Sequence, residues 1–327
     1  MNNLTKLAGS VTGRPVLMEH GAIEAWSAKL RQVDARVMER PGRLGALMRK
    51  IAGSHMSAPT SDADGDPVVF HQALAYSPMY IGEPDDSGFC WTLKNGVALM
   101  CVDTPLLDEG EIYCGTCFHG YDTLLAAMQE ASADARVGGI FLKMNCPGGF
   151  ATGGVITLAK WMRENRGKAG GKPIHVYAKM ACSGAQWIAA QADKTVCPEL
   201  AYVGSIGAYC VHEDWSGAYE KAGIRIEEFS MFENKTDGAD FKPMSDSGKA
   251  DALSDIGQIV NLFVDDMIAG RPNLTKDGIK AMRSRAFFSR HDDPERSGVA
   301  LGLVDEITDE VSAFNALAEL VSAPRRK

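Results

Sequence analysis

The sequence lacks any apolar run approaching the about 18 uncharged residues that can span a bilayer, and no basic segment followed by an apolar stretch opens it. It is also short of positive charge, because 34 Lys and Arg residues face 42 Asp and Glu residues, for a formal net charge of -8. Capture of nucleic acid or anionic lipid needs a basic face. We therefore expect a soluble, intracellular protein that binds neither nucleic acid nor a membrane.

Paired metal-ligand motifs are scarce as well. The 8 cysteines are scattered through otherwise apolar segments, which favours buried, reduced thiols over a disulfide framework. Cys114 and Cys117 have metal-like spacing, and His119 follows them, but a structural zinc site normally needs a second pair of ligands. We expect no metal and no cofactor.

The length of 327 residues suggests about two domains. Residues 20–51 carry the apolar periodicity of helices, whereas residues 58–67 form a polar, Asp- and Pro-rich linker with no means of building a core. We predict a small N-terminal helical arm with its linker over residues 1–67, and one main domain over residues 68–327.

From residue 89 on, short apolar segments alternate with segments of helical periodicity. This alternation predicts an α/β domain with a largely parallel sheet flanked by helices. Asn95-Gly96 between the first two apolar segments predicts a hairpin. The expected strands are 89–93, 97–102, 139–144, 174–179, 195–198, 206–212 and 224–229. The expected helices are 121–135, 151–164, 183–192, 214–222, 251–268, 275–282 and 311–321.

Two strand-to-helix junctions combine glycines with small or nucleophilic residues. In the first, Gly148-Gly149 follow a strand and can expose N–H groups at a helix start, either for an oxyanion or simply as a tight turn. In the second, Ser183 opens a helix, where it is either a nucleophile or only an N-cap. The Gly184 amide would then join that of Gly149 in a two-donor oxyanion hole. Cys182 is a rival nucleophile that we expect to point into the core.

Five strings in the sequence, taken together, form a specific pattern. They are CPGG, CSGAQWIAAQAD, VGSIG, NKTDGADFKPMSD and SGVALGLVDE, and the similarity in which they lie runs from about residue 95 to 310. In this order and spacing they resemble the signal peptide peptidase A family of serine proteases, and within it the head-maturation (capsid assembly) proteases of tailed phages. The resemblance implies a ClpP/crotonase-like fold and a serine endopeptidase with a Ser–Lys dyad.

The resemblance also implies a role for each matching position. Ser183 takes the place of the nucleophile and Lys235 that of the general base, although spacing alone gives Lys235 no special weight. Gly149 and Gly184 take the places of the oxyanion-hole amides, and Ser205 matches the serine that orients the lysine. The implied substrates are scaffold and capsid proteins in the host cytoplasm or the assembling procapsid, and the implied assembly is a homo-oligomeric ring.

A Ser–Lys dyad makes a physical demand that can be stated without the family. Lysine accepts a proton only when neutral, and lowering its pKa from about 10.4 to about 7.5 disfavours the charged form by roughly 4 kcal/mol. Burial away from carboxylates can do this. Asp237 and Glu233, each two residues from Lys235, must therefore point elsewhere.

Alternatives remain at the level of the sequence. His212, with Asp214 to orient it, would give a Ser–His–Asp triad in place of the dyad. A crotonase-type acyl-CoA enzyme would also use two backbone amides as an oxyanion hole, but no carboxylates or adenine-binding surface are evident beside CPGG or CSGA. A non-catalytic capsid or portal component is the third reading.

Overall fold

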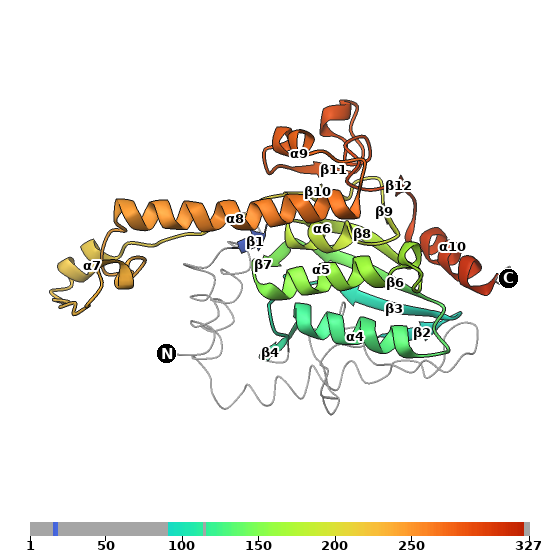
Figure 1. Ribbon diagram of the computed structural model, residues 1–327, viewed down its shortest axis with the longest axis horizontal. Coiled ribbons are helices and arrows are strands. Elements are labelled where there is room, and N and C mark those ends of the chain that lie inside the picture. The colour runs from blue at the N-terminus through green and yellow to red at the C-terminus, as the bar shows by residue number, and fades with distance from the viewer. Residues whose placement is uncertain (1–15, 19–90, 114–115, 324–327) are drawn as a thin grey trace, which may run out of the picture.

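The structure is a computed structural model that describes residues 16–18, 91–113 and 116–323. The predicted helical segment 20–51 and the linker 58–67 lie outside the described residues, so the boundary at residue 67 stays a prediction. The described part forms an α/β body from which one segment projects (Figure 1).

The body is built on one sheet of eight strands in the order β11-β10-β8-β6-β3-β2, with β9 paired to β8 and β12 paired to β9. Two short pairs, β1-β7 and β4-β5, lie outside it. The strands of the main sheet are β2 (Thr92–Lys94), β3 (Val97–Val102), β6 (Gly139–Cys146), β8 (Ile174–Cys182), β9 (Lys194–Cys197), β10 (Tyr202–Gly204), β11 (Ala286–Phe288) and β12 (Glu306–Ile307). The strands of the short pairs are β1 (Val16–Met18), β7 (Gly148–Phe150), β4 (Glu111–Tyr113) and β5 (Thr116–Phe118).

Most neighbouring strands are parallel, as the alternation of segments predicts. The pairs β3-β6, β6-β8, β8-β9, β8-β10 and β9-β12 are parallel, and only β2-β3 and β10-β11 in this sheet are antiparallel. The β2-β3 turn contains Asn95 and Gly96 with φ of 50° and 75°, the positive values that a tight hairpin turn requires. The predicted α/β class and the predicted hairpin are both confirmed.

Helices cover both faces of the sheet, and α4, α5 and α6 lie together on one of them (Figure 1). The α-helices are α4 (Tyr121–Ala133), α5 (Gly153–Asn165), α6 (Gly184–Ala189), α7 (Ser216–Lys221), α8 (Asp246–Gly270), α9 (Lys276–Met282) and α10 (Glu310–Ser322). The short 3-10 turns are η1 (Gly167–Ala169), η2 (Glu233–Thr236) and η3 (Pro294–Arg296). In the described part of the chain, no helix combines the length and the apolar character needed to cross a membrane.

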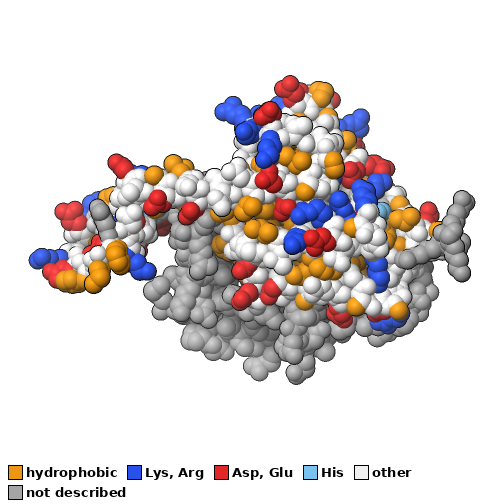
Figure 2. All heavy atoms as spheres, viewed as in Figure 1, with side chains coloured by type: hydrophobic (Ala, Val, Ile, Leu, Met, Phe, Trp, Pro, Cys, Tyr) orange, Lys and Arg blue, Asp and Glu red, His pale blue; other side chains and the backbone are white. Residues whose placement is uncertain are grey.

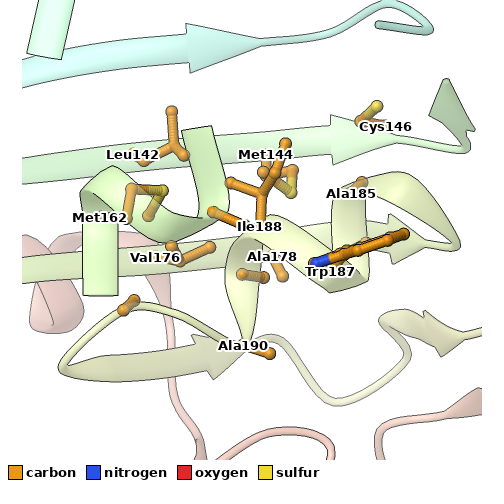
Figure 3. Packing of buried hydrophobic residues seen from close by; sticks show 14 of the residues in the cluster. Leu142, Met144, Cys146, Met162, Val176, Ala178, Ala185, Trp187, Ile188 and Ala190 are labelled. Atoms are coloured by element: carbon orange, nitrogen blue, oxygen red, sulfur yellow. The ribbon is translucent and has the colours of Figure 1, made fainter. Parts of the chain in front are cut away.

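The core follows from the two-residue period of the central strands. Ile140, Leu142 and Met144 on β6 are buried in the large cluster that they share with α4, α5 and α6. Figure 3 shows Leu142 and Met144 in this cluster with residues of α5 and α6. Phe141, between them in sequence, faces the other side and packs with Leu317 of α10 in the smaller cluster. The sheet is therefore buried on both faces, which is typical of parallel sheets.

The long helix α8 is anchored on the body at its C-terminal half. Trp187 of α6 stacks on Phe263 of α8 with ring centroids 4.4 Å apart, and the indole N–H donates to the Asp266 carboxylate at 2.8 Å. Arg163 of α5 forms an ion pair with Asp266 at 2.8 Å. The N-terminal half of α8 projects beyond the body together with α7 (Figure 1).

Two predicted strands are wrong. Residues 206–212 and 224–229 are not strands, although both have the apolar character of strands. A strand needs a partner along its edge, and no described strand pairs with either segment. Residues 224–229 instead leave Ile224, Ile226 and Phe229 on the surface. Helix α8 also begins five residues earlier than predicted, because Ser245 caps it by accepting from the Gly248 N–H at 3.0 Å.

Candidate active site

Three parallel strands end side by side at one edge of the sheet. In the registers, Cys146 of β6 pairs with Ala181 of β8, and Gly204 of β10 pairs with Cys182 of β8. The residues that follow these strand ends therefore lie close together, at the carboxyl edge where α/β sheets place their sites. The edge collects three of the motifs that the sequence singled out.

Ser183 lies at a sharp turn between β8 and α6. Its backbone has φ 54° and ψ -121°, an unusual conformation for a residue other than glycine, and its N–H donates to the Gly204 carbonyl at 2.7 Å. The hydroxyl donates to the Gly207 carbonyl at 3.3 Å. The side chain is only 1% exposed. The structure thus fixes Ser183 tightly at the junction where the sequence places it.

Gly149 lies on β7, directly beside this turn, because α6 contacts β7. A β-carbon at Gly149 would collide with the Leu106 carbonyl and the Tyr121 hydroxyl, so only glycine fits. Gly184 begins α6, where the first backbone N–H groups have no partner inside the helix. Both predicted oxyanion glycines are therefore next to the Ser183 turn.

Ser205 follows the end of β10 and adopts the same positive φ as Ser183, 54°. Its N–H donates to the Arg285 carbonyl at 2.9 Å, and the residue is half-buried. Because Gly204 pairs with Cys182, Ser205 and Ser183 leave neighbouring strands at the same level. Ser205 is thus part of the same edge.

Lys235 is in a different place. It lies in η2, within residues 211–245, which we call the extension. This segment includes α7 and projects from the body (Figure 1). Lys235 is exposed, whereas Ser183 is buried and its hydroxyl donates to the Gly207 carbonyl. The structure therefore assembles four of the five predicted site residues and leaves the fifth on the extension.

Polar contacts inside the extension engage the acidic residues near Lys235. The Ser245 hydroxyl donates to Asp237 at 2.5 Å, and this hydrogen bond lowers the pKa of the Asp237 carboxyl below its usual range. Glu228 forms an ion pair with Lys242 at 2.7 Å, which lowers the pKa of Glu228. Asp237 is thus engaged by Ser245 at the start of α8, while the Glu233 side chain lies outside the described residues.

His212 and Asp214 do not form a triad with Ser183 in this chain. A ring nitrogen of His212, Nε2, lies 3.2 Å from the Lys242 carbonyl. The Asp214 carboxylate instead accepts the Ser216 N–H at 2.9 Å, near the start of α7. The imidazole is thus held within the extension, and Asp214 is engaged in a local turn.

The cysteines near the site are not activated. The five cysteines whose side chains the structure describes are free thiols, and four of them are buried. Cys182 is fully buried, which confirms the expectation that it points into the core. Burial raises the pKa of Cys146 to about 12, so its thiol stays protonated. Cys114 of the Cys-Gly-Thr-Cys spacing lies outside the described residues, and among those described no cluster of three metal-ligating side chains occurs.

Two buried polar residues at the site were missed by the sequence analysis. Gln186 of α6 accepts the Gly204 N–H at 3.2 Å and donates to the Leu303 carbonyl at 3.0 Å, so it ties the Ser183 turn to the neighbouring loop. Tyr121 is fully buried beside Gly149, and its hydroxyl has no hydrogen-bond partner among the described residues. The signal in the sequence that could have found them is a polar side chain within an otherwise apolar helical segment.

Comparison with known families bears on this geometry. The model of peptidase family S49 matches residues 166–323, a stretch that contains Ser183, Ser205 and Lys235. This match confirms the resemblance that the motifs indicated, and it supports a peptidase.

Three curated proteins illustrate the relationship. The head-tail preconnector protein GP5 of Enterobacteria phage P21 is 24% identical over 280 residues, which cover 85% of this chain and 53% of that protein. The capsid assembly protease C of Escherichia phage lambda is 23% identical over 335 residues, covering 100% of this chain and 68% of that protein. Protease 4 of Salmonella typhi is 25% identical over 259 residues, covering 76% and 38%. The chain thus spans only part of the length of each relative.

Solved structures similar to this chain include two enoyl-CoA hydratase-type proteins. A putative enoyl-CoA hydratase/isomerase from Acinetobacter baumannii is 13% identical with a TM-score of 0.38, and covers 72% of this chain and 82% of its own. An enoyl-CoA hydratase from Mycobacterium marinum is 14% identical with a TM-score of 0.39, and covers 72% and 86%.

Proposed function

We propose that this chain is a serine endopeptidase that cleaves peptide bonds through an acyl-enzyme. The observation that carries the proposal is the Ser183 turn, where a serine in a strained conformation opens α6 beside the glycine strand β7. Strained backbone at a strand-to-helix turn is typical of positions that hold a reacting group. The match to peptidase family S49 supports cleavage of peptide bonds as the reaction at this turn.

Each step of the proposed cleavage reaction is assigned to a residue. The Ser183 hydroxyl oxygen attacks the peptide carbonyl while Lys235 takes the hydroxyl proton, and Lys235 then delivers that proton to the departing amine. The amides of Gly149 and Gly184 stabilise the oxyanion, and Ser205 orients the lysine. Lys235 then takes a proton from water, which attacks the ester carbonyl, and the ester bond to Ser183 breaks as Lys235 returns that proton to the serine oxygen.

The position of Lys235 leads to a further part of the proposal, namely that a second copy completes the site. A lysine acts as a base only where water is excluded, whereas the extension is open to solvent. The extension also exposes large apolar side chains, with Phe229 89%, Met231 92% and Phe232 74% exposed (Figure 2). Docking of this surface on a neighbouring copy would bury them and bring Lys235 to a Ser183 turn. We therefore propose a homo-oligomer, in the form of a ring, with the dyad shared between copies.

The proposed substrates are scaffold and capsid proteins in an assembling procapsid. The support is the relationship to a protein named capsid assembly protease C and to a head-tail preconnector protein. Co-expression of the chain with such scaffold and capsid proteins, followed by mass spectrometry of the fragments, identifies the bonds that are cut.

The catalytic assignment is tested by cleavage of the same scaffold protein with purified variants. Ser183→Ala and Lys235→Ala should each lower the cleavage rate by at least about a thousandfold. Lys221→Ala, another exposed lysine of the extension, should cleave at the parent rate. Cleavage by Ser183→Ala at the parent rate would show that another group is the nucleophile.

A further inference from the structure

The strand β1 comes from the N-terminal part of the chain but pairs with β7 at the candidate active site. The pairing is antiparallel, with Leu17 opposite Gly149 and Met18 opposite Gly148. Figure 1 shows β1 and β7 next to each other. A segment far away in the sequence thus lies along the strand that carries a predicted oxyanion glycine.

The backbone of β7 shows which groups face β1. The Phe150 N–H donates to the Leu106 carbonyl at 3.0 Å, and the Gly148 carbonyl accepts from the Leu106 N–H at 2.9 Å. Peptide groups of successive residues in a strand point to opposite edges. Gly149, between these two residues, therefore directs its N–H and its carbonyl to the edge that β1 covers.

This edge is the one that an extended substrate needs. A peptide binds to an open strand by adding itself as a further strand, with main-chain hydrogen bonds to that edge. For the Gly149 amide to stabilise an oxyanion, the carbonyl under attack must lie in front of that amide. In this structure the residue opposite Gly149 is Leu17.

We propose that β1 occupies the edge of β7 to which a peptide substrate adds as a strand, so that the substrate must displace residues 16–18 before it can reach the Gly149 amide. The proposal rests on the proposed peptidase function for its account of what this edge binds. The contact is intramolecular, so β1 competes with every added peptide at a high effective concentration. The chain thus carries its own competitor for the site.

The test measures peptide binding, which needs no catalysis. The full chain is prepared with Ser183→Ala, and its binding of a fluorescein-labelled peptide with the sequence of residues 11–24, VTGRPVLMEHGAIE, is followed by fluorescence anisotropy. The substitution Leu17→Pro is then introduced into this Ser183→Ala chain. Proline removes the N–H that faces Gly149 and weakens the pairing of β1. Met18→Pro is the matched control, since the Met18 N–H points to the opposite edge.

We expect Leu17→Pro to bind the peptide about fivefold more tightly or better, as loss of one or two strand hydrogen bonds implies. Met18→Pro should stay within about twofold of the parent protein. Unchanged affinity in Leu17→Pro, an equal gain in both variants, or no binding by any of the proteins would overturn the proposal. Because the readout is peptide binding to a Ser183→Ala chain, it does not depend on cleavage, and a failure of this proposal is distinguishable from a failure of the catalytic proposal.

Discussion

The body and the extension of this chain differ in how far their side chains are buried. In the body, Ser183 is 1% exposed and Trp187 is 1% exposed, and both are held by hydrogen bonds to neighbouring elements. In the extension, Phe229 is 89% exposed and Lys235 lies on the surface. The difference indicates that the body buries its large apolar side chains in its own packing, whereas the extension leaves such side chains on the surface.

The difference also divides the proposed chemistry. The proposed nucleophile and the two proposed oxyanion glycines belong to the body, and the proposed base belongs to the extension. A rigid body with a separate base makes catalysis depend on docking, so that an undocked chain would be inactive. For a protease that acts inside an assembly, this would couple activity to assembly.

The largest expected effect concerns the stability of the body. Trp187→Ala removes the stack on Phe263 and the hydrogen bond to Asp266, and should lower the free energy of unfolding by about 3–5 kcal/mol. Urea unfolding followed by circular dichroism measures it. A loss below about 1 kcal/mol would show that α8 does not depend on this contact.

The next largest effect is the loss of cleavage activity expected when Gly149 on β7 is replaced. Gly149→Ala places a methyl group against the Leu106 carbonyl and the Tyr121 hydroxyl, which must shift β7 and its amide. Cleavage of a scaffold protein should fall at least about a hundredfold in kcat/KM. Gly153→Ala, where a β-carbon meets nothing within 4 Å, is the matched control and should keep the parent value. Equal activity of the two variants would contradict the role of Gly149.

A smaller effect depends on pH. Burial lowers the pKa of His119 to about 4 from an unfolded value of 6.5, so the unfolded chain binds the proton more readily than the folded chain. The contribution of neutral His119 is complete above pH 6.5 and is lost as the pH falls toward 4. Between pH 7 and pH 5 the loss should be about 2 kcal/mol. Urea titrations of the parent and His119→Gln at both pH values measure it, and an identical pH dependence in the two proteins would contradict it.

The smallest effect on folding is expected in the extension. Phe229→Ser changes an exposed side chain, so the free energy of unfolding should change by less than about 0.5 kcal/mol. Sedimentation velocity should nevertheless show weaker self-association of this variant. If the Phe229→Ser protein is less stable than the parent but self-associates as the parent does, the proposed difference between body and extension is contradicted.

The sequence predicted the body better than the extension, for a physical reason. Strands such as β6 and β8 are apolar segments ended by Pro-Gly or Ser-Gly, and these local signals decide both the strand and the turn after it. Residues 224–229 carry a similar apolar pattern, but none of the strands in the described part of the chain pairs with them, and they are not a strand. Local sequence does not report whether a partner edge is present.

The candidate site divides in the same way. Ser183, Gly149, Gly184 and Ser205 follow or flank strand ends, so a correct α/β prediction already brings them together. The place of Lys235 depends on how the extension packs, which no local signal encodes. The pairing of β1 with β7 was not predicted at all, because a three-residue strand carries too little pattern to be recognised.

The central claim, that the nucleophile and the base come from different copies, is tested most directly by mixing two inactive proteins. Ser183→Ala and Lys235→Ala are refolded together in equal amounts and assayed on a scaffold protein. If the dyad is shared between copies, about a quarter of the sites pair an intact serine with an intact lysine, and about a quarter of the parent activity returns. If both residues act within one chain, the mixture stays as inactive as its parts, and the account is contradicted.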